Sequence, residues 1–150
     1  MSWRFLLTVL LLVLPDVAPV FAAEGNRPMP VRLAACPDSP NCVSSDATDP
    51  PHHVPPFTII LPPAEAWRLV REEVKNLPRT EIGEATGNYL HAECRSAVFR
   101  FVDDLELELR PDEKIIAVRS ASRVGYSDFG VNRRRVENLR TLLRGRGAVK

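Results

Sequence analysis

Proline is distributed unevenly along this chain, and its distribution limits where regular structure can form. Ten of the fourteen prolines fall between residues 23 and 63. Proline fixes φ and donates no backbone hydrogen bond, so a stretch this rich in proline is excluded from helices and central strands and favours extended segments. We therefore expect a proline-rich arm over residues 23–56, a single folded domain over 57–145 and a short tail over 146–150.

The length and charge of the chain bound its class. At 150 residues the chain is long enough for one well-packed core and short for two. The net charge is only +1, with 26% charged residues, so composition gives no electrostatic reason to expect a nucleic-acid partner.

The N-terminus predicts export. Arg4 precedes an apolar run over residues 5–14, which covers only about half of a hydrocarbon core when helical. Val20 and Ala22 then occupy the −3 and −1 positions of a signal-peptidase site. We predict a signal peptide over residues 1–22 and export to the periplasm. An uncleaved membrane anchor is the alternative.

Export changes how the three cysteines are interpreted, because an oxidising compartment permits disulfides. Cys36 and Cys42 flank a short segment with two prolines, and we predict that they form a disulfide whose main role is to hold this loop. Free thiols or a redox pair are the alternatives. A metal site with His52 and His53 is disfavoured, because the gap between the cysteines exceeds the usual zinc spacing. For Cys94, which alternates with apolar residues, we expect an inert buried thiol.

Hydrophobic periodicity predicts the order of elements in the domain. Phe99 and Phe101 are out of phase with the strand before them, and we expect a bulge or bend near Ser96–Ala97 to absorb the slip. The order of elements favours an α+β fold, in which helices cover one face of a curved antiparallel sheet. The predicted elements are a strand over 57–61, a helix over 63–77, strands over 79–85, 89–96, 105–110 and 114–123, and a helix from Asn132 to Gly145.

The most polar stretch of the domain reads R-S-A-S-R-V-G-Y-S-D-F-G-V-N-R-R-R over residues 119–135. We expect a strand to end near Arg123 and the last helix to begin at Asn132 as its N-cap. Polar groups gathered where a strand, a loop and a helix N-terminus meet form a natural anion site. The arginines at 133–135 stand at the end of the helix that disfavours cations, which suggests a compensating bound anion. Compensation by the protein's own acids is the alternative.

Three motifs resemble those of the domain of unknown function 1499 family. They are C-P-D-S-P-N-C-V-S-S at 36–45, R-S-A-V-F-R-F-V-D-D-L-E at 95–106 and R-S-A-S-R-V-G-Y-S-D-F-G-V-N-R at 119–133. The resemblance extends from about Cys36 to Arg144. It implies a single domain, frequent export or membrane association, and no assigned catalytic residue.

The polar residues support a binding module as the leading hypothesis, with a small anionic molecule or a lipid headgroup as ligand. Arginine suits this role because its planar fork binds carboxylate and phosphate through two hydrogen bonds. The same residues can instead form an internal ion-pair network that fixes strand register. The candidate ligand-binding residues are Arg95, Ser96, Arg100, Arg119, Ser120, Ser122, Arg123, Tyr126, Asp128, Asn132 and Arg133, beside an acidic cluster of Asp103, Asp104 and Glu106.

Two other classes of function stay open. An enzyme could use His91 with a serine and a carboxylate, or Asp103 and Asp104 around a divalent cation. However, the chain has no nucleophile elbow, phosphate loop or dinucleotide fingerprint, so we expect no cofactor and no metal. Alternatively, the chain could be a non-catalytic scaffold of the cell envelope that contacts a protein partner through its proline-rich arm. Contact with a membrane, without spanning it, is compatible with each reading.

Overall fold

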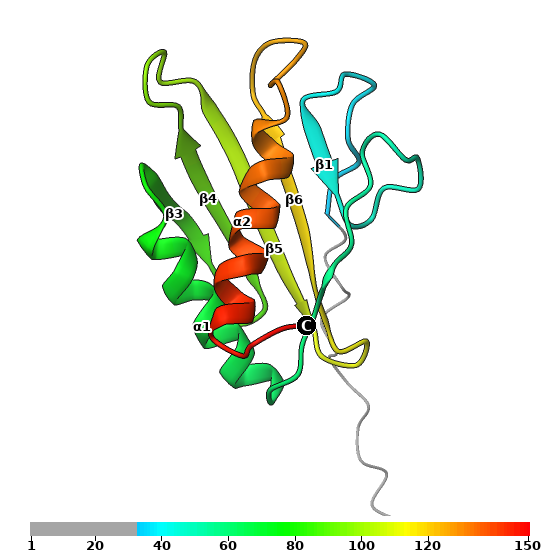
Figure 1. The fold of residues 1–150 in the computed structure, drawn as a ribbon, viewed down its shortest axis with the longest axis vertical. Coiled ribbons are helices and arrows are strands. Elements are labelled where there is room, and N and C mark those ends of the chain that lie inside the picture. The colour runs from blue at the N-terminus through cyan, green and yellow to red at the C-terminus, as the bar shows by residue number, and fades with distance from the viewer. Residues whose placement is uncertain (1–32) are drawn as a thin grey trace, which may run out of the picture.

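The computed structural model describes residues 33–150, and within them it has two helices and one antiparallel sheet of six strands (Figure 1). The predicted signal peptide and residues 23–32 of the predicted arm lie outside the described residues. None of the described helices is long and apolar enough to cross a membrane. In chain order the elements are β1 (Cys42–Ser44), β2 (Phe57–Thr58), α1 (Pro63–Asn76), β3 (Thr80–Ala85), β4 (Tyr89–Arg95), β5 (Val102–Arg110), β6 (Ile115–Ser122) and α2 (Val131–Gly145).

The predicted α+β class is confirmed, and the sheet is curved and antiparallel. Its strand order is β1-β6-β5-β4-β3, and the short β2 pairs with β6 beside β1. Register is continuous through the centre, where Leu107 lies opposite both Leu90 and Val118. β1 was not predicted. It occupies a short proline-free interval and forms one edge of the sheet. An edge strand is the part of a sheet in which prolines are best tolerated.

One face of the sheet packs against both helices. Because side chains alternate along a strand, Leu105, Leu107 and Leu109 all point toward the helices, and all three are buried. The two helices lie side by side across this face (Figure 1). Val43 and Val54, from the proline-rich stretch, belong to the same hydrophobic core. Each fully buried leucine contributes about 2 kcal/mol of hydrophobic stabilisation.

Of the predicted bulge or bend near Ser96–Ala97, the structure has the bend, over residues 97–99, and no bulge between β4 and β5. β4 ends at Arg95 and β5 begins at Val102, so residues 96–101 form the connection between these strands. Backbone and side chain of Ser96 both bond to Phe101, closing the connection at 2.9 Å in each case. Phe99 and Phe101 are out of phase because they belong to this turn, and their side chains are exposed.

The start of α2 also differs from the prediction. Gly130, with φ of 77°, is the N-cap, and Asn132 lies inside the first turn. Asp128 supplies the capping oxygens: its carboxylate accepts hydrogen bonds from the backbone N–H groups of Gly130 and Asn132 at 2.9 and 2.7 Å. An acidic side chain just before the helix also compensates the positive end of the helix dipole.

Candidate functional site

The sheet separates the polar residues that the sequence pattern groups together. Neighbouring strand residues face opposite sides, so Arg119 and Ser120 cannot contribute to one side. We call the helix-facing cluster the inner polar network; its members are Asn41, Asp103, Ser120, Ser122, Asp128, Asn132 and Arg135. We call the cluster on the opposite face the outer charged ladder; its members are Tyr89, His91, Glu93, Arg95, Asp104, Glu106, Arg119 and Arg123.

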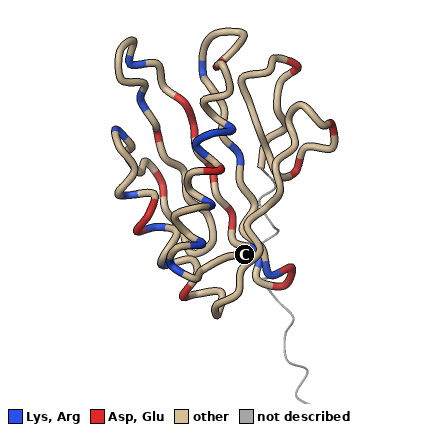
Figure 2. The backbone as a smooth tube through the Cα atoms, in the orientation of Figure 1, with Lys and Arg blue, Asp and Glu red and all other residues tan. Residues whose placement is uncertain are grey.

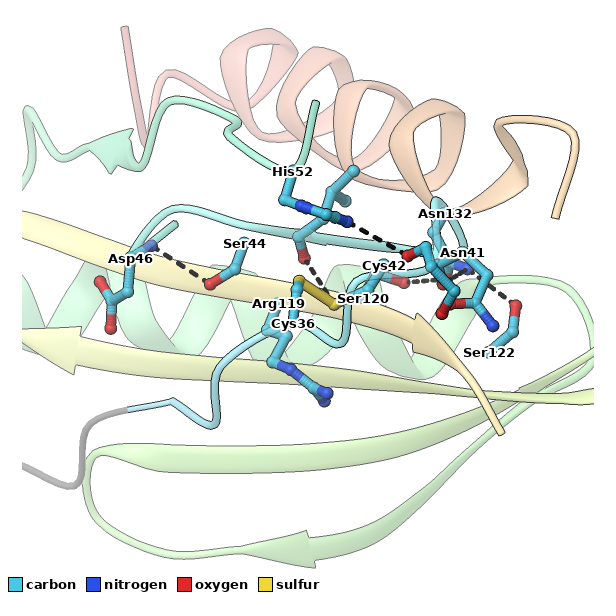
Figure 3. The surroundings of a disulfide bond; sticks show 12 residues. Cys36, Asn41, Cys42, Ser44, Asp46, His52, Arg119, Ser120, Ser122 and Asn132 are labelled. Atoms are coloured by element: carbon cyan, nitrogen blue, oxygen red, sulfur yellow. Dashed lines mark hydrogen bonds between the residues drawn. A yellow bond between two sulfur atoms is a disulfide. The ribbon is translucent and has the colours of Figure 1, made fainter. Parts of the chain in front are cut away.

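Asn132 is the centre of the inner polar network and is fully buried. Its side-chain oxygen accepts hydrogen bonds from Ser120 and Arg135, each at 2.6 Å. Its amide nitrogen donates to the backbone oxygen of Asn41 at 3.1 Å and to the Ser122 hydroxyl at 3.0 Å. Figure 3 shows this convergence of the β1 segment, β6 and α2. Asn132 therefore connects three elements that are distant in sequence.

Arg135 completes the inner polar network through an ion pair with Asp103 at 2.6 Å. The side chains of both residues are largely buried, at 14% and 8% exposure. Arg135 was not among the predicted site residues, although it lies in the arginine run that the sequence singled out. Since the members of this network satisfy one another, the network supports the fold and leaves little room for a ligand.

The predicted Cys36–Cys42 disulfide is confirmed, and it holds the loop that carries Asn41 (Figure 3). The Asn41 side chain donates to the backbone oxygen of Gly125 at 2.6 Å. The disulfide loop thus supports the connection between β6 and α2. Cys94 is a free, buried thiol, as expected, and burial raises its pKa.

In the outer charged ladder the arginines are paired with carboxylates. Arg123 bonds to Asp104 at 2.7 Å and to Glu93 at 2.6 Å. Arg119 pairs with Glu106 at 2.6 Å. These two guanidinium groups, expected to contact a ligand, are therefore already neutralised by neighbouring strands, which is the arrangement of a network that fixes strand register.

This ladder predicts acid sensitivity. Hydrogen bonds from Arg123 hold the pKa values of Asp104 and Glu93 below their ordinary values. A lowered folded-state pKa contributes stability above the unfolded carboxyl pKa of about 4, and this contribution is lost as the pH falls through the folded value. We expect urea-unfolding midpoints of the wild type to fall more steeply between about pH 5 and 3 than those of Arg123→Gln. Parallel pH profiles would contradict this account.

The geometry gives limited support to the two catalytic hypotheses. His91 lies 2.7 Å from Asp104, but Asp104 is also held by Arg123 and no serine joins the pair among the described contacts. Asp103 and Asp104 point to opposite faces of β5, so they cannot bind one divalent cation together, and that interpretation is wrong. In the part of the chain that the structure describes, no group of three or more His, Cys, Asp or Glu is placed to hold a metal ion.

The remaining candidates lie apart from both clusters. Arg133 donates to the backbone oxygens of His53 and Pro51, at 2.9 and 2.8 Å, and so anchors the segment after β1. Arg100 and Tyr126 are exposed on separate connections. Arg133 is thus bound to backbone groups and Arg135 to Asp103, and neither of these two arginines requires a bound anion.

A pocket lies where the end of α1, the end of β4 and the first turns of α2 meet. Arg79 and Arg134 donate to the backbone oxygens of Arg95 and Phe129, at 3.1 and 2.9 Å, and form no ion pair within the described residues. The described lining contains no Asp or Glu. The lining residues are Leu77, Pro78, Arg79, Thr80, Cys94, Arg95, Ser96, Ala97, Val131, Arg134, Arg135 and Asn138.

Fold and site together define a small α+β protein whose sheet carries a cluster of polar residues on each face. An arginine-lined pocket lies between α1, β4 and α2. A family model described as a protein of unknown function, DUF1499, matches residues 32–143, and the chain belongs to this family. Among curated proteins none matches the chain, and no solved structure matches it either.

Proposed function

We propose that this protein is a binding module for an anionic small molecule or lipid headgroup, held in the pocket between α1, β4 and α2. The observation that carries the proposal is the pair Arg79 and Arg134, two arginines on a pocket wall without a carboxylate partner. Uncompensated guanidinium groups attract phosphate or carboxylate, and arginine binds either through two parallel hydrogen bonds.

The rest of the lining suits an amphiphilic ligand. Leu77, Pro78 and Val131 supply apolar surface, while Thr80 and Ser96 supply hydroxyl groups. Ligand pockets combine apolar walls with a few polar groups in this way. A carboxylate or phosphate would lie against the arginines, and an attached apolar chain would lie against the aliphatic wall.

Backbone strain supports the same location. Arg79 has φ of 54°, in the left-handed region that non-glycine residues avoid. Such residues cost about 1 kcal/mol or more and concentrate at binding and catalytic sites. Here the unusual backbone directs Arg79 so that its guanidinium crosses to the β4 carbonyl at the pocket wall.

Thermal stabilisation by a defined anion tests this proposal. We expect dodecyl phosphate to raise the melting temperature of the wild type, and Arg134→Gln to weaken its binding about tenfold through loss of one charge-assisted contact. Arg144→Gln is the matched control, because Arg144 is exposed on the same helix and outside the pocket lining. Equal weakening by both variants, or no stabilisation by any anion, would leave the proposal without support.

Two further ligands in the same thermal-stabilisation experiment identify the source of the anion. Inorganic phosphate tests for a free anion, and octanoate tests for a carboxylate amphiphile. Stabilisation by phosphate alone at comparable affinity indicates a soluble ligand, whereas a requirement for the alkyl chain indicates a lipid.

We also propose that the protein acts outside the cytoplasm, in the periplasm. The Cys36–Cys42 disulfide supports this, since disulfides persist in oxidising compartments. Sequencing the N-terminus of the protein isolated from cells checks the proposed cleavage after Ala22; an intact leader on the cytoplasmic side would refute it.

A further inference from the structure

Large hydrophobic side chains are exposed on two connections at the same end of the molecule. Residues 96–101 join β4 to β5 and residues 123–130 join β6 to α2, and both lie at the top of Figure 1. Six large hydrophobic residues on these connections are between 54% and 87% exposed. We call the following set the apolar tips: Val98, Phe99, Phe101, Val124, Tyr126 and Phe129.

The fold does not account for this exposure. The hydrophobic core lies between the sheet and the helices, and none of the apolar tips belongs to it. Phe99 and Phe101 stack on each other, with ring centroids 5.6 Å apart, yet both remain open to solvent. Phe129 is the most exposed and has φ of 53°, a strained backbone for an aromatic residue. Exposed apolar side chains gathered at one end of a protein are typical of an interaction surface.

Charge identifies the partner that this surface fits. Arg100 stands between Phe99 and Phe101 in the sequence, is exposed and forms no ion pair within the described residues. The 96–101 connection contains no acid, and Figure 2 shows a basic position at this hairpin end. The Asp128 carboxylate of the other connection is turned inward, onto the backbone of Gly130 and Asn132. Aromatic side chains beside an uncompensated arginine suit the headgroup region of an anionic bilayer.

Both connections are held in place by the protein. Ser96 closes the β4–β5 connection through its bonds to Phe101, and Asn41 holds the β6–α2 connection through Gly125. A surface whose backbone is already held by hydrogen bonds loses little conformational entropy when it binds. The apolar side chains are therefore presented ready for insertion.

We infer that the protein docks on bilayers containing anionic lipid through the apolar tips and Arg100. The pocket lies beside them, since it is lined by Ala97, which belongs to the first connection, and by Val131, which directly follows the second. Docking would bring the pocket to headgroup level. That last step rests on the proposed function, whereas docking itself does not.

Vesicle co-sedimentation of the purified protein, as processed in the cell, tests the inference. The probe is phosphatidylcholine vesicles with and without one quarter phosphatidylglycerol. We expect binding to the anionic vesicles and a loss of about tenfold or more in Phe99→Ser/Phe129→Ser, because two inserting rings are removed. Ile60→Ser/Leu142→Ser is the matched control: both residues are exposed hydrophobics outside the tips. Arg100→Gln should reduce the preference for anionic vesicles.

The outcomes separate docking from ligand binding. Unchanged melting temperatures of the exposed-residue variants establish that the fold persists. Arg134→Gln should bind dodecyl phosphate about tenfold more weakly while keeping vesicle binding, because docking does not depend on the pocket. Absence of vesicle binding, or equal loss in the control, overturns the inference. So does a dimer that Phe99→Ser/Phe129→Ser abolishes without any vesicle binding, since the tips would then be a protein interface.

Discussion

Replacing Asn132 with alanine is expected to lower the free energy of unfolding by about 3 kcal/mol. The Asn132 side chain is fully buried and bonds to the β1 segment, to β6 and to Arg135 of its own helix. Truncation leaves the Asn41 carbonyl and the Ser120 hydroxyl with fewer partners in a site closed to water. Orphaned buried groups of this kind cost about 1–3 kcal/mol each.

Urea unfolding monitored by circular dichroism measures this loss. Asn138→Ala is the matched control, because Asn138 is exposed on the same helix, and its substitution should change stability by about 0.5 kcal/mol or less. An Asn132→Ala variant no less stable than the control would show that the inner polar network adds nothing to the fold.

Replacing Arg110 with methionine is expected to cost about 3 kcal/mol or more. Glu108 is buried at 1% side-chain exposure, and one of its oxygens bonds to Arg110 at 2.7 Å. Arg110 also bonds to both carboxylate oxygens of Asp46, at 2.8 and 2.7 Å, and Asp46 holds the pKa of Arg110 above its ordinary value. Removing the guanidinium leaves a buried carboxylate without its counter-charge, which is strongly destabilising.

A second substitution distinguishes this explanation from simple loss of packing. Arg110→Met/Glu108→Leu should recover much of the stability, because an apolar pair often replaces a buried ion pair without loss. Arg68→Met is the control: Arg68 pairs with Glu72 on an exposed helix face, and its loss should cost about 1 kcal/mol or less. A double variant as unstable as Arg110→Met would contradict the charge argument.

Much of the fold followed from periodicity. The alternation of Leu105, Leu107 and Leu109 with charged residues predicted a strand with one wet face, and the structure places it at the centre of the sheet. The predicted helices agree with α1 and α2 to within a residue or two at most ends. The Cys36–Cys42 pairing followed from short spacing and an expected oxidising compartment.

The candidate site was harder to predict from the sequence than the fold, for physical reasons. The arginine-rich stretch at 119–135 was read as one cluster, although alternation along β6 assigns Arg119 and Ser120 to opposite faces; that signal was present in the sequence and could have separated them. The pocket could not be predicted from the sequence. Arg79 lies between α1 and β3 and Arg134 lies near the start of α2, and only the packing of the two helices on the sheet brings them to one wall.

The two-sided character of β5 and β6 restricts how related sequences can vary. Deleting a single residue within β6 would exchange its apolar and ionic sides, placing Arg119 against the helices and Val118 against the carboxylates of β5. Insertions and deletions should therefore collect in the turns, whereas the central strands keep a constant length and change only by substitution.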